Sequence, residues 1–290
     1  MRLHYFLSET TSGYMRNQLN VVKRTGWLVG RNRSPLVDIT QFAVFAAGLI
    51  WLSVHGAQSM GYVWQWYRVS QYLYRIVDDE LVWGPLVKGF QVTIEISILS
   101  LLFTIVIGLV IAIFRMSNSL AARLLARVYL EVIRNSPLLV QLYLFYFVLA
   151  PILDVDRYWI GIFCLSFFEG AYASEIFRAG FLSVNRGQWE TGASLGLSRY
   201  HTYRYVVLPQ AVPLMLPPLT GLSVSLIKNS SIVSVIAIFE LTAEGQNIIA
   251  DTFMSFEIWL TVAAMYLMIT VSLSLLVNIF EARMRKRSKR

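Results

Sequence analysis

Long apolar stretches that recur along the chain constrain its fold more than any other feature of the sequence. A helix needs about 20 apolar residues to cross a hydrocarbon core about 30 Å thick. Apolar residues make up 56% of the 290 positions and charged residues only 14%, against about a quarter charged in a soluble domain. Six stretches approach or exceed this length: 37–54, 90–114, 136–153, 158–181, 212–239 and 258–280. We therefore predict an all-α membrane protein with six transmembrane helices.

The distribution of lysine and arginine predicts the orientation of these helices. Basic residues crowd the two tails and the loops after the second and fourth spans, whereas the loops after the third and fifth spans are mainly acidic. Since short basic loops stay on the cytoplasmic side, we predict that both termini are cytoplasmic. Membrane topology thereby explains the formal net charge of +8, which gives no reason to expect a nucleic-acid partner.

On this basis the chain divides into five segments. Residues 1–36 form a basic cytoplasmic tail, 37–54 the first span, 55–89 an extracytoplasmic segment, 90–281 a core with the other five spans, and 282–290 a second basic tail. The extracytoplasmic segment is rich in Trp and Tyr, which is typical of the aromatic belt at a membrane–water interface. Contact with a substrate is the alternative role for these aromatic side chains.

The residues indicate neither an enzyme nor a nucleotide-hydrolysing subunit. Residues 221–228 lack the spacing of a glycine-rich phosphate-binding loop, and no nucleophile, base and acid converge in the sequence. His4, His55 and His201 are scattered, and Cys164 is the single cysteine, so the usual ligand spacing of a metal site is missing. We expect no cofactor in this chain, so a partner or an ion gradient must supply the energy for any transport.

Four segments carry a family resemblance. In chain order they are EVIRNSPLLVQLYLFYF (131–147), GAYASEIFRAGFLSVNRGQWE (170–190), LGLSRYHTYRYVVLPQA (195–211) and LIKNSSIVSVIAIFEL (226–241). Through them the chain resembles the permease subunits of ABC importers for polar amino acids, which are binding-protein-dependent inner-membrane components. The resemblance covers most of the predicted core and leaves the N-terminal part of the chain outside it.

This resemblance implies a bacterial inner-membrane subunit that works with several partners. These are two cytoplasmic ATPase subunits that bind ATP and Mg²⁺, a second permease copy or paralogue, and an extracytoplasmic amino-acid-binding protein. The loop 187–210 would contain a coupling helix that docks on the ATPase, where small residues let the partner approach the backbone closely. The coupling residues are Glu190, Gly192, Ala193, Gly196, Leu208 and Pro209.

Polar residues inside the predicted spans are candidates for a substrate pathway, because polar groups at that depth usually face protein or a wet cavity. They are Glu175, Lys228, Asn229, Ser230 and Ser231. Lys228 would meet a substrate carboxylate, and Asn229 and the two serines would hydrogen-bond its polar groups.

Structural pairing is the alternative role for the charged residues of this set. Arg178 lies one helical turn after Glu175 and is an available partner. Lys228 is a second candidate, since it would neutralise either Glu175 or Glu169. At the entry to the third span, Glu131 and Arg134 stand at i and i+3, where they are expected to pair with each other.

The residue after Lys228 favours one class of amino acid. Similar family members often carry Asp there, whereas this chain has the uncharged Asn229. Charge complementarity then favours glutamate, aspartate or glutamine over cationic amino acids. An ion-coupled secondary transporter is the alternative function, but such folds usually contain internal repeats, and we find none in this sequence.

Overall fold

The computed structural model describes residues 35–287, and the chain divides into two compact units between Val63 and Trp64. Most of the predicted tail 1–36 and the last three residues of the tail 282–290 lie outside the described residues. In its described part the first unit is one helix, α2 (Pro35–Ser59), which contains a 20-residue apolar stretch, Val37–Gly56. This stretch covers the predicted first span, and most of its side chains are exposed, as suits a helix that faces lipid.

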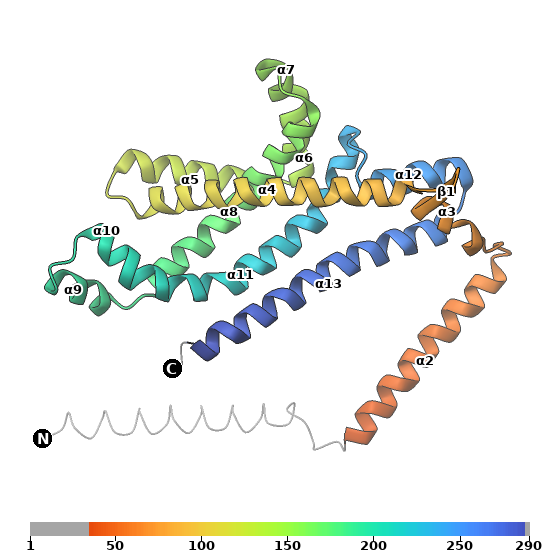
Figure 1. Ribbon diagram of the computed structural model, residues 1–290, viewed down its shortest axis with the longest axis horizontal. Helices are drawn as coiled ribbons and strands as arrows, with labels where there is room; N and C mark the ends of the chain where they lie inside the picture. Colours follow the sequence, from red (N-terminus) through yellow and green to blue (C-terminus); the bar gives the residue numbers. More distant parts are fainter. Residues whose placement is uncertain (1–34, 288–290) are drawn as a thin grey trace, which may run out of the picture. The chain divides into compact units, whose positions relative to one another are not determined.

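The second unit contains the other membrane helices (Figure 1). They are α4 (Pro85–Met116), α5 (Leu120–Arg134), α6 (Leu138–Leu144), α7 (Ala150–Leu153), α8 (Arg157–Leu182), α11 (Leu208–Asn229) and α13 (Ser255–Arg287). Over residues 35–287, five helices are long and apolar enough to cross a membrane, or six if the bent pair built from α5 to α7 counts as one span. The predicted all-α fold with six spans is thereby confirmed.

Short elements precede α4 in a segment for which the sequence predicted only aromatic side chains at an interface. They are η1 (Trp66–Arg68), α3 (Ser70–Leu73) and an antiparallel hairpin of β1 (Tyr74–Val77) and β2 (Glu80–Trp83). The hairpin turns at Asp78 and Asp79, whose φ angles of 52° and 61° are left-handed, a conformation that Asp tolerates better than most residues. Pro85 then begins α4, which suits its preference for the first helical position. The second span therefore starts earlier than the predicted residue 90.

The most extensive helix–helix contact in the core is between α4 and α8, and small residues allow the two helices to pack closely. A Cβ added at Gly108 would lie 2.5 Å from the Cβ of Ala173, closer than two carbon atoms can pack. Nearby, the Ser166 hydroxyl donates to the Ser100 carbonyl at 3.2 Å. Small and hydroxyl side chains of this kind commonly join helices inside membranes. The two helices therefore form a close-packed pair that the rest of the unit surrounds.

The third span lies where the sequence predicted it, since residues 138–153 are helical without interruption and the predicted range is 136–153. The chain forms α5, breaks, and continues as α6, the π-helical turn η2 (Phe145–Leu149) and α7, with a bend of 109° at the break. In Figure 1 the α6–α7 arm leaves the α4–α8 pair at a steep angle. Pro137 explains the break, because its ring excludes the preceding residue from helical conformation and it has no N–H to donate. The basic stretch predicted to precede this span is helix α5 itself.

Polar side chains satisfy the carbonyl groups that the break leaves open. The Gln141 amide donates to the Ile133 carbonyl at 2.8 Å, and the Ser136 hydroxyl donates to the Val132 carbonyl at 2.7 Å. The Asn135 side-chain amide adds a second hydrogen bond, at 2.8 Å, to the Glu131 carbonyl, which already accepts from the Asn135 N–H. Because unsatisfied backbone groups are costly away from water, these contacts allow a bent helix at this depth.

The fifth span also changes character along its length. Helix α11 tolerates Pro213, Pro217 and Pro218 and passes at its end into a 3-10 helix, η4 (Ser230–Ile236). Helix α12 (Leu241–Thr252) follows, and α13 then runs to Arg287, so residues 282–287 extend the last helix and do not form a separate tail.

The tight α4–α8 contact makes a testable prediction. We expect Gly108→Leu to destabilise the protein by about 1–3 kcal/mol, because the larger side chain overpacks the helix pair. The measurement is the melting temperature and the yield of monodisperse protein in detergent. Gly221→Ala in α11 is the control, since no described atom lies within 4 Å of a Cβ at that position. An unchanged melting temperature for Gly108→Leu would contradict the packing described.

Candidate functional site

The predicted coupling loop forms a compact helical segment between α8 and α11. It comprises α9 (Arg186–Ser194), α10 (Arg199–Thr202) and the π-helical turn η3 (Tyr203–Val207), at the end of the unit away from the hairpin (Figure 1). We call residues 186–207 the docking segment. Asn185 caps α9 by accepting a hydrogen bond from the Gly187 N–H at 2.8 Å, which is a typical N-cap interaction.

Gly196 ends α9 in a left-handed conformation, with φ of 70°. The Leu197 N–H bonds to the Gly192 carbonyl at 3.1 Å, and the Gly196 N–H bonds to the Ala193 carbonyl at 3.0 Å. These two bonds define a Schellman motif, which prefers glycine at the left-handed position. Among the described residues no atom lies within 4 Å of a Cβ at Gly196, so its outer side is open.

The other predicted coupling residues differ in position. Glu190 and Ala193 are exposed, and Glu190 pairs with Arg186 one turn earlier at 3.2 Å. Gly192 faces inward, because a Cβ there would lie 2.8 Å from Thr202; its small size therefore serves packing within the segment. Leu208 and Pro209 begin α11.

Aromatic contacts hold the docking segment on the core of the unit. The ring of Tyr203 contacts Trp189 of α9 edge-to-face, with centroids 4.8 Å apart, and Phe181 at the end of α8 at 6.2 Å. Leu195, Tyr200 and other large side chains remain exposed on the outside. The segment is thus anchored on one side and presents an apolar and polar surface on the other.

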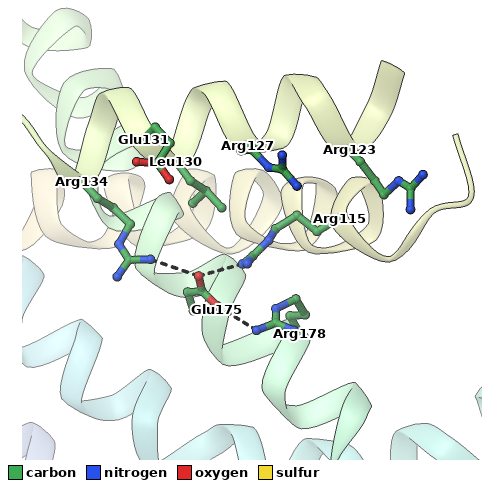
Figure 2. A pocket seen from close by; sticks show the side chains of 8 residues that line it. All are labelled: Arg115, Arg123, Arg127, Leu130, Glu131, Arg134, Glu175 and Arg178. Carbon is green, nitrogen blue, oxygen red and sulfur yellow. Dashed lines mark hydrogen bonds and ion pairs between the residues drawn. The ribbon is translucent and has the colours of Figure 1, made fainter. Parts of the chain in front are cut away.

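Glu175 lies at the junction of three helices. Its carboxylate forms ion pairs with Arg115 of α4 at 2.9 Å, Arg134 of α5 at 3.1 Å and Arg178 of α8 at 3.5 Å (Figure 2). The expected pair with Arg178 exists but is the longest of the three. The alternative of a Lys228 partner for Glu175 is wrong.

The expected pair between Glu131 and Arg134 is also wrong. The Arg134 guanidinium reaches Glu175, whereas the Glu131 carboxylate accepts from the Asn135 amide at 2.9 Å. A partner 41 residues away in sequence thus replaces the neighbour on the same helix.

A cavity of about 530 Å³ opens between α8 and α11, and we call it the Glu169 cavity. Glu169 is only 3% exposed, and its carboxylate accepts a hydrogen bond from the Asn229 amide at 2.8 Å. The alternative in which Lys228 neutralises Glu169 is therefore wrong too. The lining residues are Arg134, Phe168, Glu169, Tyr172, Glu175, Ile176, Pro218, Leu222, Ser225 and Asn229.

A second hollow, of about 330 Å³, adjoins the first, and we call it the arginine cleft. Figure 2 shows its side chains coming from α4, α5 and α8 around the Glu175 carboxylate. Arg115, Arg123, Arg127, Leu130, Glu131, Arg134, Glu175 and Arg178 line it. Arg134 and Glu175 line both hollows, so the two adjoin at this ion pair.

The remaining predicted pathway residues lie elsewhere, so the five do not form one group. Lys228 and Ser231 line a third cavity, of about 270 Å³, against Trp259 and Tyr266 of α13. Ser230 is buried and donates to the Ile227 carbonyl at 2.8 Å. Successive residues of a helix are turned by about 100°, which places Lys228 and Asn229 on different sides of α11.

Sequence reasoning placed Glu240 in an acidic outer loop and missed its role as a buried cap. It accepts hydrogen bonds from the Tyr266 hydroxyl at 2.8 Å and from the Thr242 and Ala243 N–H groups at 2.9 and 3.0 Å. Burial raises the pKa of the Glu240 carboxyl, and these bonds work in the opposite direction. The sequence contained no usual signal for this role, because N-caps are typically Ser, Thr, Asp or Asn.

Metal binding has no support in the part of the chain that the structure describes, where no group of three His, Cys, Asp or Glu side chains could hold an ion. The polar groups of the two hollows are suited to binding a charged or zwitterionic solute.

Comparison with known proteins points to one family. Residues 104–286 match the family described as "Binding-protein-dependent transport system inner membrane component". The chain is 41% identical over 214 residues to the glutamine transport system permease protein GlnP of Escherichia coli strain K12, covering 72% of this chain and 98% of that protein. It is 38% identical over 205 residues to the L-cystine transport system permease protein TcyB of Bacillus subtilis strain 168, covering 70% and 87%.

A solved structure shows the same fold. The crystal structure of an amino acid ABC transporter with histidines superimposes with a TM-score of 0.63 at 35% identity, covering 69% of this chain and 94% of that one. An inward-facing MetNI methionine ABC transporter, at 17% identity and a TM-score of 0.61, shares the fold.

The Schellman motif makes a prediction about residue 196. We expect Gly196→Val to loosen the docking segment by about 1–2 kcal/mol, because the left-handed conformation is strained for this side chain. Amide hydrogen exchange over residues 186–202 should then accelerate. Gly196→Asn is the matched control, since Asn adopts the same conformation more readily. Equal exchange in the two variants would contradict a conformational role for this glycine.

Proposed function

Since the chain belongs to the family of binding-protein-dependent transport system inner membrane components, we infer that it is the permease subunit of an amino acid ABC importer. It is a transport component of the inner membrane and not an enzyme. We further propose that separate ATPase subunits drive it, and that its substrate is a polar amino acid of the glutamine, glutamate and aspartate class, with glutamine as the first candidate.

One observation carries the proposal: the docking segment joins the two helices that form the walls of the Glu169 cavity. Helix α8 contributes Glu169, Tyr172 and Glu175, and α11 contributes Ser225 and Asn229. Any movement of the docking segment is therefore applied directly to both walls.

In the proposed importer, the outer face of α9 around Glu190, Ala193 and Gly196 contacts an ATPase subunit. Closure of two ATPases on ATP and Mg²⁺ shifts α8 and α11 as packed bodies, which switches the cavity between inward and outward access. A second permease copy or paralogue completes the pathway, and an extracytoplasmic binding protein delivers the amino acid. The chain itself supplies no chemical step.

The groups of the Glu169 cavity suit a zwitterion. Glu169 offers a carboxylate to a substrate ammonium group, and Arg134 offers a guanidinium to a substrate carboxylate. Asn229 donates to Glu169, which leaves its amide oxygen to accept from a substrate amide. Two glutamates against one arginine line the cavity, and this charge disfavours an additional substrate carboxylate. Glutamine is therefore favoured over glutamate and aspartate.

Glu175 and Asn229 keep their proposed place on the substrate pathway, because both line this cavity. Lys228 and Ser231 face the cavity against α13, and Ser230 is buried. We propose that these three act by supporting α11 and have no direct contact with the substrate.

The source of energy provides the test of function. We expect the complete importer in vesicles to accumulate glutamine only with ATP and binding protein, and to stop with vanadate. A protonophore should leave uptake unchanged. Uptake that a protonophore abolishes and vanadate does not affect would replace this proposal by an ion-coupled transporter.

Substitutions in the two cavities test the substrate pathway. We expect Glu169→Gln to lower glutamine uptake by about tenfold or more, since it removes the charge from a buried hydrogen-bonding partner. Lys228→Met, in the separate cavity, is the comparison and should change uptake by less than about twofold. Copurification of the ATPase with each variant controls for assembly. A large loss of uptake in Lys228→Met, with normal uptake in Glu169→Gln, would instead place the substrate pathway in the cavity between Lys228 and α13.

A further inference from the structure

The arginine cleft carries more positive charge than its own carboxylates balance. Five arginines and two glutamates line it, a surplus of three positive charges. Three of the arginines already converge on Glu175. Arg123 and Arg127 of α5 form no ion pair with any side chain that the structure describes, although they line the same cleft. Two guanidinium groups therefore remain available in a hollow that already attracts anions.

One of the converging arginines also has unused donor capacity. The Nε of Arg178 is buried and has no hydrogen-bond acceptor among the described residues. Buried donors are normally paired, so a donor without an acceptor beside a hollow indicates that an additional acceptor belongs there. A carboxylate fits the planar, forked geometry of guanidinium groups better than a single-point acceptor does.

The cleft adjoins the Glu169 cavity at the Arg134–Glu175 ion pair, which lines both hollows. Along α8, Glu175 and Arg178 follow Glu169 toward the docking segment, and each step of three residues turns the side chain by about 60°, so the helix presents Glu169 to the cavity and Arg178 to the cleft. The Glu169 cavity has a surplus of one negative charge and the cleft a surplus of three positive charges. Arg134 lines both hollows and therefore lies where the net charge changes from negative to positive. A zwitterion in this field is oriented with its ammonium group toward Glu169 and its carboxylate toward the cleft.

We propose that the arginine cleft is an exit subsite that receives the α-carboxylate of the amino acid as it leaves the Glu169 cavity, with Arg123 and Arg127 as its binding groups. This inference rests on the proposed function. Arg115 and Arg178 hold Glu175, and Arg134 passes the carboxylate from the cavity to the cleft. Because α8 runs from the cleft into α9, the subsite lies on the side where the proposed ATPase docks.

The test measures inhibition by amino acid already inside the vesicles. The complete importer is reconstituted, the vesicles are loaded with increasing glutamine, and uptake of labelled glutamine is followed relative to empty vesicles for each variant. Lumenal glutamine that occupies the subsite should slow wild-type uptake. In R123Q/R127Q the half-inhibiting concentration should rise by about threefold to fivefold, the effect of a partly exposed charge pair. R123K/R127K, which keeps both charges, should stay closer to wild type.

Two further arms give the ligand chemistry. Lumenal glutamine α-amide, which lacks the carboxylate, should inhibit the wild type more weakly than glutamine does. The measurement is repeated in vesicles of phosphatidylcholine alone and with added phosphatidylglycerol. The same shift in both lipids supports the proposal. A shift that appears only with phosphatidylglycerol would assign the cleft to a lipid phosphate and overturn it.

The failures of the two proposals are distinguishable. Suppose that the wild type accumulates glutamine and that R123Q/R127Q has the same half-inhibiting concentration of lumenal glutamine as the wild type. The exit subsite is then wrong, and the proposed function stands. If the wild type does not accumulate glutamine with ATP and binding protein, the proposed substrate is wrong and the exit subsite for it falls as well.

Discussion

The carboxylate of Glu175 is the contact on which the arrangement of this unit depends. Glu175 lies in the last third of α8, beside Arg115 in the last turn of α4, and arginines from α4, α5 and α8 together balance its charge where it is removed from water in part. Of the three ion pairs, the one with Arg134 joins α5 to α8, together with the hydrogen bond that the Tyr129 hydroxyl donates to the Phe167 carbonyl. The ion pair also places Arg134 between the two hollows, since this residue bonds to Glu175 and lines both.

The proposed transmission between the docking segment and the cavity rests on how α8 and α11 pack. Helices α8 and α11 leave opposite ends of the docking segment and pack tightly close to it, where a Cβ added at Gly180 would lie 2.3 Å from the side chain of Met215. Close-packed contacts of this kind do not deform continuously; they shift between discrete arrangements. The aromatic contacts of Trp189 and Tyr203 attach α9 to the same region. A force on α9 is thus carried into both walls of the cavity within a few helical turns.

Several features of the site were visible in the sequence only in part. The residues Glu175 and Asn229 were recognisable as polar groups inside apolar spans, and the cavity confirms that they lie together on one hollow. Pro137 indicated in the sequence that the helix breaks before the third span, but nothing in the sequence indicated the bend of 109° at that break. Arg134 appeared to have a partner in Glu131 on its own helix, because the spacing allowed that pair. The structure instead joins it to Glu175, and only the packing of α5 on α8 brings these two side chains together.

By itself the sequence predicted the class, the approximate limits of the spans and the polar segment between α8 and α11, because these follow from local properties. Apolar length and short motifs are carried by residues that are neighbours in the chain. The tertiary structure decided which charges meet: it separated Lys228 from Asn229, paired Glu169 with Asn229, and gathered five arginines around one cleft. Electrostatic pairing depends on distance in space, and inside a membrane the cost of an unpaired charge makes that pairing decisive. The packing of all the helices decides which of their faces meet. The three hollows could therefore be found only in the folded chain.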